Sequence, residues 1–289
     1  MVRHPFSSPL TIVRSIRRAS CLTLLSITAA AHAQDSGPVQ LRLHPRVGDT
    51  LHTWLEQQTE VSATTPGNAL APARTVTTSV SIHSRTIVRS VQQATATVLT
   101  IVDSASLSST DAHAATQIAD AQRGLQGQQL VLVLGADGTV ESAHDAKGAP
   151  VTRDAADAMA AMPAIFPKKP VTVGEQWIRE MPLPSGGALG ARGSGHARAV
   201  FHLDSLQRGG GVAYVSMRGD IVPDSTSQGV ELSGSISGTM QVDRVRGWMT
   251  DSRFIVIVRS VVTPPAASGL AQMRFATRVT QRLRTMDKR

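Results

Sequence analysis

The alternation of apolar and polar positions along this chain predicts a protein built mainly from β-strands. The clearest case is the run 75–91. Its even positions from 76 to 82 carry Val, Thr, Val and Ile, whereas the odd positions from 77 to 83 carry Thr, Ser, Ser and His. The alternation changes phase after Ser84, and a straight strand of this length would span about 55 Å. We therefore expect a bulge or bend near residues 84–86 and a strongly curved sheet.

Similar runs predict further strands over 39–44, 50–62, 95–107, 130–134, 175–182, 196–206, 212–221, 229–242, 248–262 and 273–285. Asp137-Gly138 predicts a tight hairpin turn. Residues 255–258 are apolar on both faces, which predicts a strand covered on both sides. In the last strand, Phe275, Val279 and Leu283 should face a core and the arginines should face water. Short helices are expected in the Ala-rich segments 111–122 and 153–162.

One weak pattern occurs twice, because Val47-Gly48-Asp49 is echoed by Val173-Gly174-Glu175 before a strand-like run. The repeat predicts two similar halves, about 39–150 and 170–286, joined by the helix near 153–162. The expected fold is thus mainly β, an antiparallel and strongly curved sheet or incomplete barrel of about twelve strands, with one or two short helices. We expect a single domain over residues 39–289. Two tandem domains hinged near residues 166–170 are the alternative.

The N-terminal segment has the features of an export signal. Residues 1–33 contain four arginines and no acidic residue, an apolar run from Cys21 to Ala31, and a small-x-small site, Ala31-His32-Ala33. Cleavage between Ala33 and Gln34 would release a periplasmic or secreted protein that begins with a disordered lead, residues 34–38. The apolar run is too short to span a membrane, and we expect no transmembrane segment in the mature chain.

Removing this segment changes the composition of the protein. The formal charge falls from +8 to +4 with the loss of the four arginines, and the only cysteine, Cys21, is lost with them. The mature chain can therefore form neither a disulfide nor a thiol site. Nucleic-acid binding is disfavoured by export, by the modest charge and by the 3% aromatic content.

The inventory of catalytic and metal-binding residues is thin, and we expect no catalytic residues, no cofactor and no metal. His202 and Asp204 are two residues apart in a predicted strand, about 7 Å, which is close enough to share a metal with an outside ligand. A solvated polar face explains the same pair without a ligand.

Two sets of residues are candidates for binding. Trp54, Trp177 and Trp248 could line an apolar ligand cavity, or they could pack at strand ends in a core. Arg274, Arg278 and Arg282 share one face of the last strand and could bind the anionic headgroups of lipids or acidic glycans. An exposed face in an Arg-rich sequence is the alternative.

Three blocks carry a resemblance to a known family. They are Val47-Gly48-Asp49, the run 166–177 (FPKKPVTVGEQW), and Gly238-Thr239 followed by Val242-Asp243 and Gly247-Trp248. The chain resembles an uncharacterised family of exported bacterial proteins, a domain of unknown function with a similar Pro-x-Lys-Pro-Val-x-Val-Gly-Asp-x-Trp block. The resemblance implies a β-rich envelope protein without an assigned reaction, so it assigns no functional residue. Glu175 stands where the family usually has Asp, and the lipoprotein cysteine of some members is absent.

Three classes of function follow from these observations. The first is a non-catalytic exported envelope protein that binds or carries an apolar or amphipathic ligand, for which lipid is the expected partner. The second is a structural or assembly partner of another envelope protein, because edge strands can pair with a second chain. The third is a hydrolase with a site that the sequence does not reveal.

Overall fold

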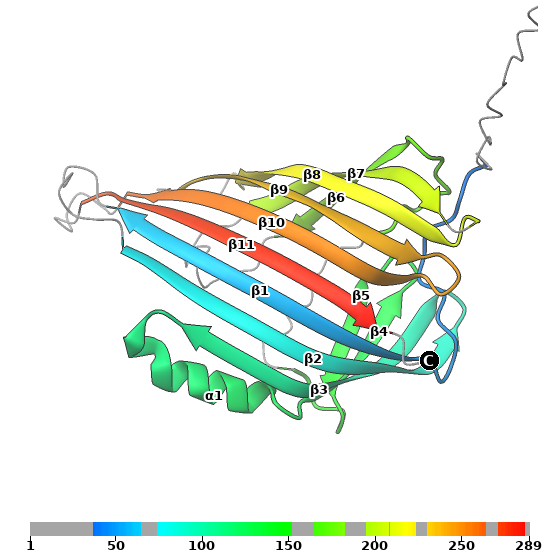
Figure 1. Cartoon of the computed structure of the whole chain (residues 1–289), viewed down its shortest axis with the longest axis horizontal. Helices are drawn as coiled ribbons and strands as arrows, with labels where there is room; N and C mark the ends of the chain where they lie inside the picture. Colours follow the sequence, from blue (N-terminus) through cyan, green and yellow to red (C-terminus); the bar gives the residue numbers. More distant parts are fainter. Residues whose placement is uncertain are drawn as a thin grey trace, which may run out of the picture. The chain divides into compact units, whose positions relative to one another are not determined.

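Eleven antiparallel strands form one sheet in the computed structural model, in the order β5-β4-β3-β2-β1-β11-β10-β9-β8-β7-β6 (Figure 1). The described residues are 37–64, 74–151, 165–182, 195–207, 209–223, 230–263 and 271–286, and all belong to one compact unit, Gln34–Arg289. The strands are β1 Thr50–Thr64, β2 Arg74–Gln92, β3 Thr95–Ser109, β4 Gln129–Gly135, β5 Val140–Asp145, β6 Gln176–Pro182, β7 Gly195–Gln207, β8 Val212–Pro223, β9 Val230–Asp243, β10 Trp248–Val262 and β11 Met273–Met286.

The order of the strands follows two meanders that meet in the middle of the sheet. β1 to β5 run outward in one direction and β11 back to β6 run outward in the other, while β1 pairs with β11 from His52–Met286 to Thr64–Arg274. The sheet therefore ends at β5 and β6 and does not close into a barrel. The predicted fold class, a mainly β and strongly curved open sheet, is confirmed.

Most predicted elements are present, with two differences. Residues 39–44 do not form a strand, and only Val39 makes an isolated bridge, to Val171. The sheet accordingly has eleven strands instead of about twelve. The Ala-rich segment is a 3-10 turn, η1 Ala112–Ala114, followed by helix α1 Ala115–Leu125. The predicted helix at 153–162 lies outside the described residues.

The strand β2 is long and irregular, but its irregularities differ from the predicted one. Next to Ser84 the register slips because β3 contributes an extra residue, Asp103. The extra residue of β2 itself is Arg89, between Val88 and Ser90. The prediction of a bulge at residues 84–86 was therefore wrong about the strand that carries it. An extra residue in either strand increases local twist and bends the ladder.

The repeated sequence blocks build the same local structure twice. Gly48 and Gly174 precede β1 and β6 with φ of +89° and +91°, in the left-handed region that favours glycine. Their N–H groups donate to Val88 O at 2.9 Å and to Leu203 O at 2.8 Å. In each half a one-residue bulge follows directly, between Val88 and Ser90 and between Leu203 and Ser205.

The carboxylates of these two turns have equivalent contacts. Asp49 accepts a hydrogen bond from the backbone N–H of Arg46 at 2.9 Å, and Glu175 accepts one from Thr172 at 2.9 Å. Both carboxylates reach back three residues and satisfy an N–H at the start of the turn. Glu175 thus makes the contact that the shorter Asp makes in the first half.

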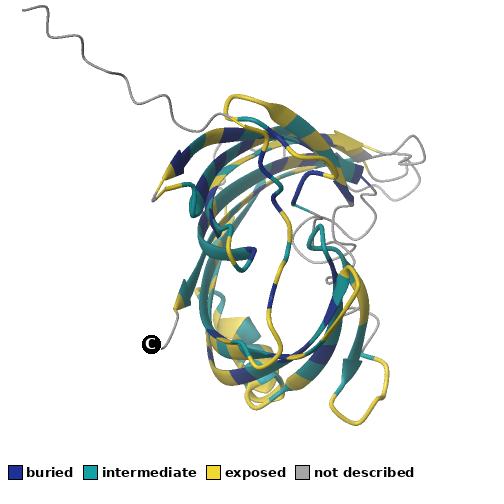
Figure 2. Cartoon of the chain, turned by 90° about the vertical axis from the view of Figure 1, so that its right-hand side faces the viewer, coloured by how far each residue is buried: buried dark blue, intermediate teal, exposed yellow. Residues whose placement is uncertain are grey.

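The main hydrophobic core lies on the concave face of the sheet, over β6 to β10. Buried side chains alternate along β7 and β8, where Phe201 and Leu203 are fully buried and pair with Met217 and Val215. The segment before β1 supplies Val39 and Leu41 to this core, and the segment before β6 supplies Phe166 and Val171. Seen along its length, the sheet curls around these segments (Figure 2).

A second, smaller cluster occupies the other half of the curl. Val88, Ala96 and Val98 are its buried members, and Leu132, Leu134 and Trp248 pack against them. Trp248 belongs to β10, whereas the buried members belong to β2 and β3. The indole therefore reaches across the concave side and joins the two halves of the sheet.

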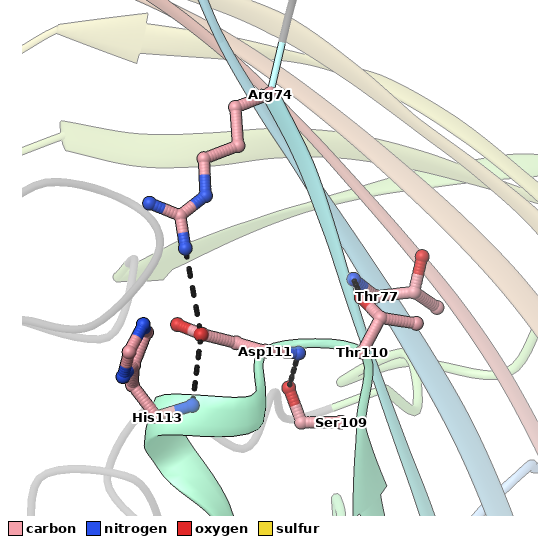
Figure 3. Close-up of polar contacts among 6 residues, drawn as sticks. All are labelled: Arg74, Thr77, Ser109, Thr110, Asp111 and His113. Carbon is pink, nitrogen blue, oxygen red and sulfur yellow. Dashed lines mark hydrogen bonds and ion pairs between the residues drawn. The ribbon is translucent and has the colours of Figure 1, made fainter.

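The 3-10 turn that leads into helix α1 is tied to the start of β2 by polar contacts (Figure 3). Asp111 caps the turn by accepting from the backbone N–H of His113 at 3.1 Å, and it forms an ion pair with Arg74 at 3.4 Å. Thr110 Oγ1 accepts from the backbone N–H of Thr77 at 2.9 Å. These contacts hold the beginning of the helical segment against the start of β2.

A concave, uncharged floor as the candidate functional site

Residues of β11, β1 and β2 form a grid on the concave face. Register partners in antiparallel strands lie on the same face, so each row of the grid can be read across the sheet. The rows are Leu283–Leu55–Ile82, Gln281–Gln57–Val80, Val279–Thr59–Thr78 and Thr277–Val61–Val76. We call these twelve residues the floor.

The rows of the floor continue into the main core, which shows that the floor is concave. The second row extends from Gln281 through Phe254, Gly238 and Met217 to Phe201. Phe201 is fully buried beneath the segments that precede β1 and β6. The side chains of the floor therefore point into the curl of the sheet.

The floor is only partly covered, unlike the surfaces on either side of it. Its apolar members are half-buried, and none of them belongs to either of the two core clusters. Thr277 alone is buried, at 3% exposure. Between two packed clusters, the described structure thus leaves a strip of apolar side chains that could take further apolar contacts.

The floor contains no charged residue. Its seven aliphatic side chains alternate with two glutamines and three threonines. Along the four rows, the charged residues of β1, β2 and β11 lie on the convex face, where Glu56, Glu60, Arg278 and Arg282 are found. Arg74 shares the face of the floor one row beyond it and forms an ion pair with Asp111. Because the four rows of the floor carry no charge, this surface can be buried against an apolar molecule.

One end of the concave side is closed by the segment 39–45, which we call the strap. Its Leu43 N–H donates to Ala136 O at 2.8 Å and its His44 N–H donates to Arg246 O at 3.0 Å. Because Ala136 lies between β4 and β5 and Arg246 between β9 and β10, the strap spans the opening of the curl, as Figure 2 shows. The residue before Trp248, Gly247, lies against the backbone of the strap.

A cavity of about 140 Å³ lies under the strap, against the turn between β2 and β3. Arg42, His44, Gln93 and Leu134 are among its lining residues. Ligand pockets typically measure about 300–1,000 Å³, so this cavity is small for a lipid-sized molecule.

The two ends of the sheet are joined by a polar clamp around Asp137 and Arg179. Arg179, on β6, is 13% exposed and lies 3.8 Å from the carboxylate of Asp137, in the turn between β4 and β5. The same guanidinium donates to Phe166 O, and Phe166 N–H donates to Asp137 O at 3.2 Å. Trp177 Nε1 donates to Ile165 O at 2.9 Å. Residues 165–166 thus bridge two ends of the sheet that do not pair.

This clamp should weaken in acid. Burial raises the pKa of Asp137, but hydrogen bonds from Thr139 and the charge of Arg179 outweigh it, so that the pKa lies below its ordinary value. A carboxyl with a lowered pKa stabilises the fold at neutral pH, and that contribution is lost as the pH falls below about 4. We expect Asp137→Asn to lower the free energy of unfolding at pH 7 and to match the wild type more closely at pH 3. Urea unfolding of wild type and variant at pH 7 and at pH 3 measures the two differences in stability. The same difference at both pH values would contradict the prediction.

The three tryptophans occupy three different environments. Trp177 stacks on Phe201, with ring centroids 5.5 Å apart, and packs against the main core. Trp54 lies on the convex side, where it stacks on His83 at 5.3 Å and lies 5.5 Å from the guanidinium of Arg284. Trp248 packs against the smaller core cluster. Trp54 therefore does not line the concave side, while Trp177 and Trp248 belong to packed cores at its margins.

The arginine face of β11 is flanked by acidic residues. Arg278 is the register partner of Glu60, and Arg282 is the partner of Glu56. Arg282 also lies 3.5 Å from the carboxylate of Asp251. Arg274 and Arg278 are exposed. Because β1 places its carboxylates beside these arginines, the positive potential of the stripe is reduced, which disfavours a dedicated site for anionic headgroups.

His202 and Asp204 contact each other, as their spacing suggested, on the convex face. His202 Nδ1 lies 2.5 Å from Asp204 Oδ1, and Ser216 donates to the same oxygen at 2.8 Å. A serine nucleophile would instead have its hydroxyl against the histidine. Within the described residues, no group of three or more His, Cys, Asp or Glu side chains could hold a metal ion.

Neither helical element in the described part of the chain has the length and apolar character needed to cross a membrane. Sequence reasoning did not single out the floor, although Val76, Thr78, Val80 and Ile82 were the first residues to reveal a strand. The alternation showed that these four side chains share one face of a strand, but it could not show which strands pair with that strand. The missing signal was the pairing of β1 with β11.

These observations define the chain as a mainly β protein with an open, curled sheet and an uncharged concave floor. A family of unknown function, DUF6263, matches residues 152–249, which include β6 to β9 and the turn that leads into β10. The matched range contains the run 166–177 and the block from Gly238 to Trp248, but not Val47-Gly48-Asp49. No curated protein matches the chain.

Two solved structures resemble the chain weakly. One is the outer membrane protein OprG from Pseudomonas aeruginosa, with 7% identity, a TM-score of 0.20, and coverage of 85% of this chain and 99% of that one. The other is DynF from the dynemicin biosynthesis pathway of Micromonospora chersina, with 10% identity, a TM-score of 0.22, and coverage of 85% of both chains. Likenesses at these TM-scores carry no argument about function.

Proposed function

We propose that this protein is a non-catalytic, exported envelope protein that binds an apolar or amphipathic ligand on the concave floor. The observation that carries the proposal is the contrast between the floor and its surroundings. The floor is uncharged, mainly aliphatic and partly uncovered, while the core clusters beside it are packed. Covering these partly exposed aliphatic side chains would stabilise a complex by about 25 cal/mol for each Å² of apolar surface removed from water.

The location in the envelope rests on the N-terminal sequence. Four arginines, an apolar run and the Ala31-His32-Ala33 site favour export and cleavage before Gln34. The strap begins only five residues after this site, at Val39. A ligand that is sparingly soluble in water would need such a carrier in an aqueous compartment.

Val80→Asp should weaken binding of an apolar probe. Val80 lies in the second row of the floor, and a carboxylate there would have no cation beside it when an apolar molecule covers it. We expect at least about a tenfold loss of affinity for N-phenyl-1-naphthylamine, a neutral apolar dye. Fluorescence titration of the purified mature protein measures it.

The matched control is Ser79→Asp, the neighbouring residue on the same strand. Ser79 is exposed on the convex face, so the same charge should leave dye affinity unchanged. Thermal unfolding of both variants separates lost binding from lost folding. Equal affinities for the two folded variants would place the dye elsewhere and contradict a site on the floor.

The identity of bound molecules can be tested by native mass spectrometry of protein purified from the cells that produce it. Co-purified lipid is the expected result. A stoichiometric protein partner without lipid would favour the assembly role instead. The observation behind that alternative is that β5 and β6 end the sheet and that, in the described structure, no strand pairs with their outer sides.

A further inference from the structure

The inventory of the floor also restricts the ligand, if the proposed function holds. We propose that the ligand is a neutral acyl lipid whose uncharged polar group, a hydroxyl or an ester, lies inside the curl against Gln57 and Gln281. A lipid that carries a phosphate or carboxylate at that position is excluded. This inference rests on the proposed function and names the chemistry of its ligand.

Gln57 and Gln281 are register partners in the middle of the floor. The row on one side of them is aliphatic, Leu283–Leu55–Ile82, and the row on the other contains Val279 with two threonines. A glutamine amide has two N–H donors and one carbonyl acceptor. The contact from Gln57 to Thr59 Oγ1, at 3.4 Å, uses only one donor. The two amides can therefore donate a hydrogen bond to a hydroxyl group and accept one from it, or donate a hydrogen bond to the carbonyl of an ester.

A buried hydroxyl nearby also has no partner. Ser252 is 1% exposed and pairs with Leu283 across β10 and β11, on the same concave face. Its Oγ atom has no hydrogen-bond partner in the described structure. Buried polar groups without partners are rare in folded proteins. The polar group beside Leu283 on this side of the floor is therefore an uncharged hydroxyl, which suits an uncharged polar group of the ligand.

A negatively charged group of a lipid would have no cationic side chain to pair with beside Gln57 and Gln281. The four rows of the floor contain no Lys, Arg or His, and the arginines of β11 lie on the opposite face beside Glu56 and Glu60. Within the described strands, two arginines share the concave face outside the floor, and both have partners. Arg74 is paired with Asp111, and Arg179 is joined to Asp137 and Phe166 in the clamp. Moving an ionised phosphate out of water without a paired cation is costly, whereas a hydroxyl needs only a hydrogen bond.

Two probes with the same acyl chain test the inference. They are 1-oleoylglycerol and 1-oleoyl lysophosphatidate, which differ by one phosphate. We expect the mature protein to bind the neutral probe at least about tenfold more tightly at pH 7.5. Competition against N-phenyl-1-naphthylamine, with both lipids below their micellar concentrations, gives the two affinities. Equal affinities, or a preference for the phosphate, would overturn the neutral ligand and leave the proposed function standing.

A cation placed on the floor should reverse the preference. Gln281→Lys puts an ammonium beside the polar group of the ligand, so lysophosphatidate should gain and 1-oleoylglycerol should lose affinity. The matched control, Thr280→Lys, adds the same charge on the exposed convex side and should leave the ratio unchanged. A shift of the ratio in the control alone would place the polar group outside the curl and refute the inference. Failure of wild type to bind either lipid would refute the proposed function itself.

Discussion

Phe201→Ala is expected to cost about 3–5 kcal/mol of folding free energy, the loss typical of a fully buried phenylalanine. Phe201 has 0% exposure, stacks on Trp177 and pairs with Met217 in the main core. Its removal would leave a cavity beneath the segments that precede β1 and β6, which pack on the same cluster. Urea unfolding should show the loss, with a fall in melting temperature on the order of 10 °C.

The control for this truncation is Arg198→Ala on the same strand. Arg198 is exposed on the convex side, where an ion pair contributes at most about 1 kcal/mol. A similar loss at both positions would show that β7 is sensitive to any substitution. The assignment of the two faces of the strand would then be wrong.

Gly247→Val should displace the strap and cost about 3 kcal/mol or more. Gly247 has φ of +73°, and a β-carbon there would lie 2.0 Å from Arg42 O and 2.7 Å from Leu43 Cα. Both atoms are backbone atoms of the strap, so no side chain can move aside to make room. We expect lower stability in urea and faster hydrogen exchange of the Leu43 and His44 amides, whose acceptors are Ala136 O and Arg246 O.

Gly48→Val is the control that separates backbone strain from the steric clash with the strap. Gly48 has φ of +89°, but a β-carbon there would have no atom within 4 Å. The control therefore carries backbone strain alone, about 1–3 kcal/mol. It should leave exchange of the Leu43 amide nearly unchanged. Equal losses of stability and equal exchange in the two variants would show that the strap does not depend on Gly247.

The elements of the fold could be predicted because their signals are local. Alternation predicted the strands on both sides of the chain's middle, and Asp137-Gly138 predicted the tight turn that joins β4 to β5. Residues 39–44 were misassigned because an alternating segment that crosses an opening has the same pattern as a strand. Its hydrogen bonds go to single carbonyls of distant turns, which no local pattern can reveal.

Burial was harder to predict than the faces of the strands. Ile255 and Ile257 were expected to be covered, but they are half-buried on the convex side, while Val258 is 2% exposed on the concave side. Phe275 faces inward as expected but is only half-buried. Truncation of Phe275 should thus cost less than truncation of Phe201. Both cases depend on which elements lie over a face, and this is a property of tertiary packing.

The candidate site was predictable only in its composition. The residues of β2 that belong to the floor were recognised as one face of a strand, whereas Gln57 and Gln281 attracted no notice because an isolated glutamine carries no spacing signal. Only the register of β1 with β11 makes them neighbours. The tryptophans and arginines were conspicuous in the sequence, but Trp177 and Trp248 pack in cores and Trp54 lies on the convex side. Arg278 and Arg282 lie beside carboxylates.

The pairing of β1 with β11 has a consequence for the order in which the chain can fold. These strands are the first and the last, so the centre of the sheet joins residues more than two hundred positions apart. A ribosome releases β1 long before β11 exists. Until then one side of β1 has no partner, and neither half can complete the curl. Contacts of such separation slow folding, so the nascent chain would stay open until its last strand arrives, a state in which it can still be threaded through a narrow pore.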